Sequence, residues 1–385
     1  MSAPEASGGR GVTAPAAGRP GATTTPSAAA GTIPARTPAA SAPPAAGRRR
    51  PVPWTRLAWV TWRQQRATLA GAAALLGLLG LYLLIMGLKI HSAYASVIAC
   101  HPASSEACQQ LTNSFNHDYW GGGGGSAIQA GGAQTVSSLL LIFPVLIGVF
   151  AGSPLIAREL ETGTFRFAWT QGCGRLRWAI AKLVLLAAVL TAAAWAFSEL
   201  FTWYSQPFIA DGQVSRLLPL EFGLLGVAFA GWTLAAFAIG AFAGAVIRRT
   251  VPAMAAALVT STVLALATAI SLRQHYETPL TINGAKPTPA GAWVLGSFFT
   301  GPDGKPVSQA TIDNAMQQMP PAKIQKSSGS DPFGAWLSQH HYTQWISYQP
   351  AARFWHFQLI EGGWLLALSL ILIAATVWLV RRRAA

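Results

Sequence analysis

The sequence predicts an all-α integral membrane protein with six transmembrane helices, a helix in the membrane interface before the first span, and a short helix between the second and third spans. Two observations support this fold class. Charged residues make up 10% of the 385 positions, against about 25% in ordinary soluble domains, and hydrophobic residues make up 52%. Six uncharged apolar runs, each close to the length that crosses a hydrocarbon core of about 30 Å, lie at residues 69–88, 137–157, 183–198, 222–247, 251–272 and 362–380.

The positive charge of the chain indicates its orientation in the membrane. The formal net charge is +14, which could also suggest a nucleic-acid partner. With the N-terminus in the cytoplasm, however, 19 of the 27 Lys and Arg residues fall in the four cytoplasmic segments 1–66, 158–182, 248–250 and 381–385. Basic residues collect at the cytoplasmic ends of spans. We therefore predict a multi-pass membrane protein with a cytoplasmic N-terminus and no nucleic-acid partner.

The chain before the first span divides into two parts. Residues 1–53 consist mostly of Ala, Pro, Gly, Ser and Thr, so we predict a disordered cytoplasmic tail. Residues 54–69 instead alternate Trp with Arg, as suits a helix lying in the inner membrane interface. The alternative is a basic flank of the first span. The region 54–272 then holds the first five spans.

Two regions are expected on the outer side. Residues 273–356 form the longest loop, rich in Pro, Gln and Trp, and we predict a small, partly helical extracellular cap. Residues 357–385 follow as the sixth helix with its basic cytoplasmic end. Cys100 and Cys108 share the first outer loop, where an oxidising compartment favours a disulfide between them.

The sequence contains none of the motifs that would indicate an enzyme. The Walker-type phosphate loop, His-Glu-x-x-His and Gly-x-Ser-x-Gly are all absent. His340 and His341 are adjacent, so they cannot both face one ion on a regular helix. We therefore expect no catalytic residue, no metal site and no cofactor in this chain.

One charged stretch separates two apolar runs and is predicted to form a helix, a break and a second helix. Gly163 is suited to end the helix that continues the second span, and Thr164 is a good N-cap for the next helix. The segment TFRFAWTQ that begins there carries three aromatic residues and a single charge. Such a helix at the cytoplasmic surface fits the groove of another protein. The alternative is a helix that lies flat on the lipid.

The whole stretch LIARELETGTFRFAWTQGCGRLRWAIAKL resembles the cytoplasmic loop after the second span of ABC-2 type transporter permeases. That family has an acidic pair, Gly-Thr, an aromatic or leucine-rich turn, a basic cluster and Lys-Leu. The GCG at 172–174 departs from the Pro-x-Ser turn of many relatives. The matching positions are Glu159, Glu161, Gly163, Thr164, the stretch 165–171, Arg175, Arg177 and Lys182.

The resemblance implies a function as well as a fold. The segment 158–178 would hold a coupling helix that docks on a separate ATP-hydrolysing subunit. Two copies of this subunit would form a permease homodimer with a path through the plasma membrane, and the composition looks most like high-GC bacterial exporters of drugs or antibiotics. A membrane anchor or sensor without transport activity is the alternative. The residues implied in partner binding are Glu159, Glu161, Gly163, Thr164, Phe165, Phe167, Trp169, Arg175 and Arg177.

A few residues within or beside the spans are also candidates for a role. Glu199 ends the third predicted span and Glu221 begins the fourth, so both could line a substrate path or be solvated at the outer rim. Pro144 and Pro154 predict kinks in the second span. The motifs GVFAG (148–152) and GAFAG (240–244) would permit close helix packing, although chance matches are common in a chain this rich in Gly and Ala.

Overall fold

The computed structural model of the chain describes residues 54–120, 132–163, 175–212, 214–317 and 332–383. These residues belong to one unit that runs from Arg50 to Ala385. The tail predicted at 1–53 and the short helix predicted to begin at Thr164 lie outside the described residues.

The predicted helical membrane fold with six spans is confirmed, because six helices are long and apolar enough to cross a membrane. Five of the six are longer than the uncharged runs, since several charged residues lie inside the helices; the fourth, Gly226–Ile247, is slightly shorter than its run. Within the described parts of the chain these spans are Ala70–Ala99, Ala133–Thr162, Ala179–Ala210, Gly226–Ile247, Thr250–His275 and Ala351–Arg382.

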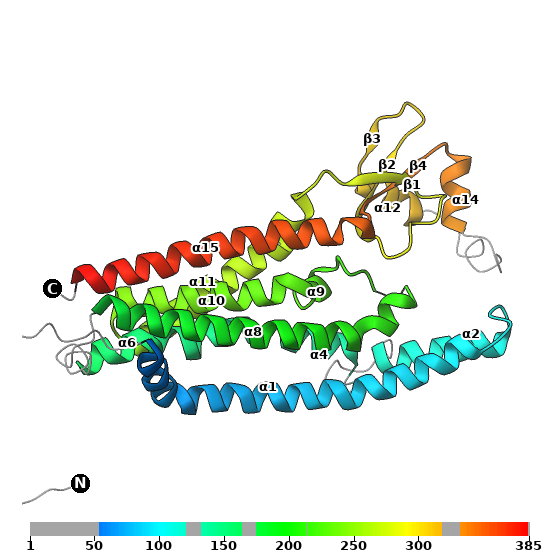
Figure 1. Cartoon of the computed structure of the whole chain (residues 1–385). Helices are drawn as coiled ribbons and strands as arrows, with labels where there is room; N and C mark the ends of the chain where they lie inside the picture. Colours follow the sequence, from blue (N-terminus) through cyan, green and yellow to red (C-terminus); the bar gives the residue numbers. More distant parts are fainter. Residues whose placement is uncertain (1–53, 121–131, 164–174, 213, 318–331, 384–385) are drawn as a thin grey trace, which may run out of the picture. The chain divides into compact units, whose positions relative to one another are not determined.

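The spans consist of the following elements (Figure 1). The first, third, fourth and sixth contain α1 (Trp54–Ala99), α8 (Arg175–Ala210), α10 (Gly226–Ile247) and α15 (Phe354–Arg383, preceded by η5, Ala351–Arg353). The second is divided into α4 (Ala133–Leu140), α5 (Phe143–Ile147), η2 (Gly148–Gly152) and α6 (Ser153–Thr162). The fifth contains α11 (Thr250–Ala267), η3 (Thr268–Leu272) and η4 (Arg273–His275). Short helices between spans are α2 (Glu106–Phe115), η1 (Asn116–Trp120) and α9 (Pro219–Phe222).

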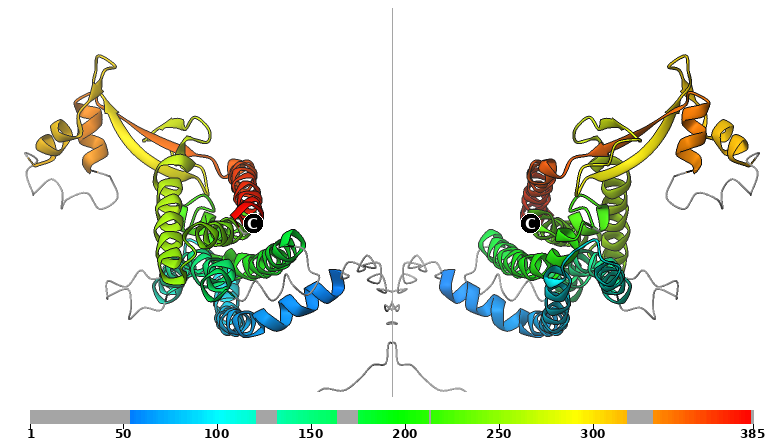
Figure 2. Two further views of the ribbon diagram at one scale, coloured as in Figure 1. Left: turned by 90° about the vertical axis from the view of Figure 1, so that its left-hand side faces the viewer. Right: turned by 90° about the vertical axis from the view of Figure 1, so that its right-hand side faces the viewer.

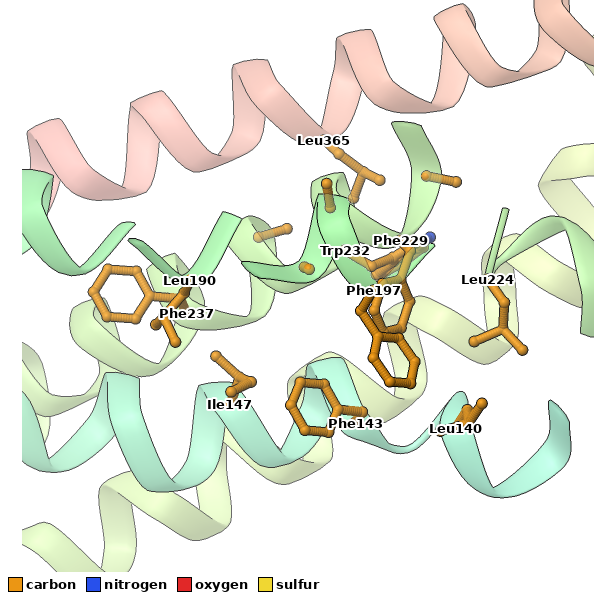
Figure 3. Packing of buried hydrophobic residues seen from close by; sticks show 14 of the residues in the cluster. Leu140, Phe143, Ile147, Leu190, Phe197, Leu224, Phe229, Trp232, Phe237 and Leu365 are labelled. Carbon is orange, nitrogen blue, oxygen red and sulfur yellow. The ribbon is translucent and has the colours of Figure 1, made fainter. Parts of the chain in front are cut away.

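Helix α10 lies at the centre of the bundle. It packs against α15, α8, α11 and the segments of the second span, and most of its side chains are buried. Large aromatic residues fill the space on one side of it (Figure 3). The ring of Phe229 lies 6.3 Å from that of Phe143 and 5.8 Å from that of Phe197. These contacts join the second, third and fourth spans.

The two glycine-containing motifs pack against each other. A Cβ atom added to Gly152 would lie 2.6 Å from the carbonyl oxygen of Phe237, and one added to Gly244 would lie 2.5 Å from that of Ser153. Small residues therefore let the backbones of η2 and α10 approach closely. The second span breaks at residues 141–142, just before Pro144, and a π-helical turn precedes Pro154, as expected for residues that lack a backbone N–H.

The region 276–350 contains two short helices, in keeping with the partly helical cap that was predicted, and also a four-stranded antiparallel sheet that was not predicted. The strand order is β1-β4-β2-β3. A small core of Phe299, Ile312 and Leu337 joins the sheet to its two helices. The elements are β1 (Leu280–Asn283), β2 (Trp293–Thr300), β3 (Pro306–Val307), α12 (Gln309–Gln317), α14 (Pro332–Gln339) and β4 (Thr343–Gln349).

The bundle has two ends, which we name the sheet end and the C-terminal end. The sheet lies beyond one end of the spans, and α15 and α6 finish at the other (Figure 1). The first turns of α1 run across the direction of the other helices at the C-terminal end (Figure 2). Trp59 and Trp62 are exposed there, and Arg63 lies over the Trp59 ring at 5.4 Å. A position in the membrane interface stays a prediction for this segment.

Candidate functional site

The connection between the second and third spans lies at the C-terminal end of the bundle. Helix α6 ends at Thr162, and Gly163 follows with a φ of 69°, a left-handed conformation that favours glycine. Thr164, Phe165, Phe167 and Trp169 lie outside the described residues. Arg177 is partly buried in the first turn of α8, which begins at Arg175.

Two glutamates hold this connection to neighbouring spans. The carboxylate of Glu159 accepts a hydrogen bond from the ammonium of Lys182, which is only 2% exposed. This ion pair joins α6 to α8. A buried ammonium needs such a partner, because leaving it unpaired would be strongly unfavourable.

Glu161 joins α6 to the start of α11. Its Oε2 accepts hydrogen bonds from the backbone N–H of Thr250 at 3.0 Å and from the hydroxyl of Thr250 at 2.7 Å. Thr250 is the first residue of α11, where backbone N–H groups lack intrahelical partners and a negative charge is favourable. The end of α6 is thereby fixed to both α8 and α11.

A second polar cluster lies at the sheet end and was not predicted. Arg273 and Glu361 form a bidentate ion pair, with Nη2–Oε1 at 2.8 Å and Nε–Oε2 at 3.0 Å, and both residues are buried. The indole N–H of Trp232 donates to Oε1 at 2.8 Å, and the hydroxyl of Tyr276 donates to Oε2 at 3.1 Å. Four donors therefore satisfy one buried carboxylate.

The same arginine holds the short helix α9 in place. Its Nη1 donates to the carbonyl oxygen of Pro219 at 3.2 Å, and its guanidinium lies 4.3 Å from the centre of the Phe222 ring. The turn after α9 is held by two further side chains. Gln358 donates to the carbonyl oxygens of Phe222 and Leu225. The hydroxyl of Ser198 lies 2.9 Å from the carbonyl oxygen of Leu224.

Glu221 lies within this connection between the third and fourth spans, and it is buried rather than solvated at the rim. It is 1% exposed, and its Oε1 lies 2.9 Å from the hydroxyl of Ser137. Its Oε2 has no hydrogen-bond partner among the described residues. Loss of water around the carboxyl raises the pKa of Glu221 to about 7. A role in a substrate path stays a prediction.

Glu199 has a different environment, because it is exposed and lines a cleft of about 380 Å³. The cleft lies between α8, the connection that precedes α10, and the start of α15. Its lining residues are Glu199, Thr202, Trp203, Gln206, Ile209, Arg216, Leu225, Gly226, Phe354 and Trp355.

A second cavity, of about 280 Å³, has mainly apolar walls from the second, fourth and fifth spans. Leu141 and Pro144 lie on one side of it, and Leu258, Ser261 and Leu266 lie on the other. The hydroxyl of Ser261 has no hydrogen-bond partner in the described part of the chain. This cavity can hold an apolar group.

Cys100 and Cys108 form a disulfide in the structure, between the end of α1 and the start of α2. Among the residues that the structure describes, no three His, Cys, Asp or Glu side chains gather where they could hold a metal ion.

Comparison with known protein families gives a match. A family model described as ABC-2 membrane transporter related matches residues 73–273, just over half of the chain. This range covers most of the first span and all of the second to fourth, and it ends in the fifth. No curated protein and no solved structure matches the chain.

Proposed function

Because the chain belongs to the ABC-2 membrane transporter related family, we propose that it is the permease subunit of an ATP-binding-cassette transporter. A separate ATPase subunit supplies the energy by docking on the connection at 158–178. Two permease subunits form the path along a shared interface. The protein lies in a bacterial plasma membrane with its N-terminus and the docking connection in the cytoplasm.

The observation that best supports this proposal is the attachment of the connection to three spans. Glu159 is paired with Lys182 of α8, and Glu161 is hydrogen-bonded to Thr250 of α11. A force applied to the connection would therefore act on the second, third and fifth spans together.

The substrate we propose is a hydrophobic or amphiphilic compound that is exported. The cavity beside Ser261 supports an apolar substrate, since its walls come almost entirely from apolar side chains of three spans. The alternative function is a membrane anchor or sensor without transport activity. An ATPase that co-purifies with the protein would favour the transporter over the anchor or sensor.

Replacing Phe165 and Trp169 together by Ala tests the docking proposal. Buried aromatic anchors at the centre of an interface commonly cost about 2 kcal/mol or more when truncated, which corresponds to about a thirtyfold loss of affinity. We expect the variant to reach the membrane normally, to lose the ATPase on co-purification and to lose transport.

The matched control is Phe298→Ala. This phenylalanine is 42% exposed and lies on β2 at the sheet end, so its loss should leave both the complex and transport unchanged. If the Phe165/Trp169 variant keeps its ATPase at wild-type affinity, the connection is not the docking site.

A further inference from the structure

The cleft that contains Glu199 combines a carboxylate with tryptophan side chains. On α8, five lining residues follow one face of the helix at the spacing of successive turns: Glu199, Thr202, Trp203, Gln206 and Ile209. Trp355, at the start of α15, forms part of the opposite wall and is 59% exposed.

Glu199 is an unusual residue for its position. It lies in a helix that is apolar enough to cross the membrane, about three turns before the end of α8 at Ala210. An ionisable side chain in such a helix is costly and usually has a partner of opposite charge. In the described part of the chain, Glu199 has neither a hydrogen bond nor an ion pair. The carboxylate therefore faces the cleft without a protein partner.

We propose that this cleft binds an amphiphilic organic cation. Its ammonium or other positive group lies between the carboxylate of Glu199 and the ring of Trp355. The ring of Trp203 stacks on that of His91 at 4.7 Å, so it forms part of the cleft wall and is not the aromatic partner of the cation. Attraction to aromatic faces and to a carboxylate favours a positive group. The apolar part of the molecule lies against Ile209 and Leu225. The inference rests on the proposed function only in that it takes this cation to be a transported compound.

The two possible ligand classes, an organic cation and a zwitterion, require different roles for Arg216. It is exposed, lines the same cleft, and forms no ion pair with Glu199. Arg216 lies in the connection between the third and fourth spans. The preceding residue, Ser215, donates a hydrogen bond to the carbonyl oxygen of Gly291, which lies beyond the spans. A cation at Glu199 is repelled by this guanidinium, whereas the negative group of a zwitterion would need it.

The test uses the full-length protein in phosphatidylcholine nanodiscs with two probes of equal shape and opposite charge. These are tetraphenylphosphonium and tetraphenylborate, each measured by equilibrium binding after subtraction of empty nanodiscs. We expect saturable binding of the phosphonium, and only the partition seen in empty discs for the borate. Because no ATPase is present, this binding can succeed or fail independently of docking and transport.

Variants then assign the binding to the cleft. Glu199→Gln should weaken phosphonium binding by about tenfold or more, because the charge attraction is lost. Trp355→Leu should weaken it by about fivefold. Arg216→Gln should strengthen it, whereas the control Glu106→Gln, an exposed carboxylate on α2, should have no effect. Equal binding of the two probes, unchanged affinity in Glu199→Gln, or weaker binding in Arg216→Gln would each overturn the proposal.

Discussion

Among single residues, Glu221 has the most unusual hydrogen bonding. The hydroxyl of Ser137 lies 2.9 Å from Oε1 of Glu221 and also 2.9 Å from the carbonyl oxygen of Ala133. A hydroxyl has only one hydrogen, so it cannot donate to both acceptors. Both contacts become hydrogen bonds if Glu221 is protonated, donates to Ser137, and Ser137 donates to Ala133. The geometry therefore favours the neutral acid.

A protonated Glu221 makes stability depend on pH. The pKa of Glu221 rises from 4.5 to about 7 because burial removes water from the carboxylate. Between these two pH values the folded protein holds a proton that the unfolded chain has released. The free energy of unfolding should therefore fall as the pH rises from about 4.5 to about 7, by about 3 kcal/mol in total.

Thermal unfolding in detergent at pH 5, 6, 7 and 8 measures this effect. In Glu221→Gln the side chain cannot ionise, so the difference in stability between this variant and the wild type should grow in favour of the variant as the pH rises. Glu106→Gln should follow the wild type. A difference between Glu221→Gln and wild type that does not change with pH would show that this carboxyl does not titrate in the folded protein.

From the sequence, the contact partners of functional residues were harder to predict than the residues themselves. Glu159, Glu161 and Lys182 could be singled out from the family pattern, but their roles depend on contacts between distant segments. Glu161 contacts Thr250, which lies 89 positions further along the chain. The opposite holds for Gly163, because its left-handed conformation is a local property and could be predicted from the residue type alone.

Between elements, paired charges explain why most of the predicted spans were too short. An uncharged run ends by definition at the first charge, and Arg273 directly follows one run while Glu361 directly precedes another. In the structure these two charges neutralise each other inside the bundle, so both helices continue through them. Lys182 behaves in the same way at the other end of the bundle. Opposite charges that flank apolar runs at the same end therefore predict a buried pair.

The Arg273–Glu361 pair should be far more sensitive to the loss of one partner than to the loss of both. Glu361→Gln leaves a buried guanidinium without its counter-charge, which should lower the free energy of unfolding by about 3–5 kcal/mol. In Arg273→Met/Glu361→Gln no charge remains; the amide oxygen can still accept from Trp232, and the amide NH2 can donate to the hydroxyl oxygen of Tyr276. We expect this double variant to be clearly more stable than the single one.

Thermal unfolding of purified protein provides the comparison. The control is Asp303→Asn, which removes the partner of Lys305 in a pair whose side chains are 58% and 82% exposed. A pair exposed to water should contribute about 1 kcal/mol or less. If the single and double variants at Arg273 and Glu361 are equally unstable, the ion pair is not what joins η4 to α15.

At the scale of the whole molecule, the six spans could be predicted because the solvent determines them. A helix that crosses lipid must be apolar over about 20 residues, and this pattern is visible without any knowledge of tertiary contacts. The sheet at 276–350 has no comparable signal. Its strands are short, and β1 joins β4 across about 60 intervening residues, so their pairing depends on packing rather than on a local pattern.

The orientation of the molecule in the membrane stays a prediction, and it can be tested at both ends of the bundle. In a variant without cysteines, single cysteines replace Ser114 or Lys286 at the sheet end, and Thr162 or Arg249 at the C-terminal end. All four positions are exposed. With the N-terminus in the cytoplasm, an impermeant maleimide should label only the first two in intact cells, and all four after permeabilisation. Labelling of Thr162→Cys in intact cells would place the docking connection outside, where a cytoplasmic ATPase cannot reach it, and the proposed function would then be wrong even if the fold is right.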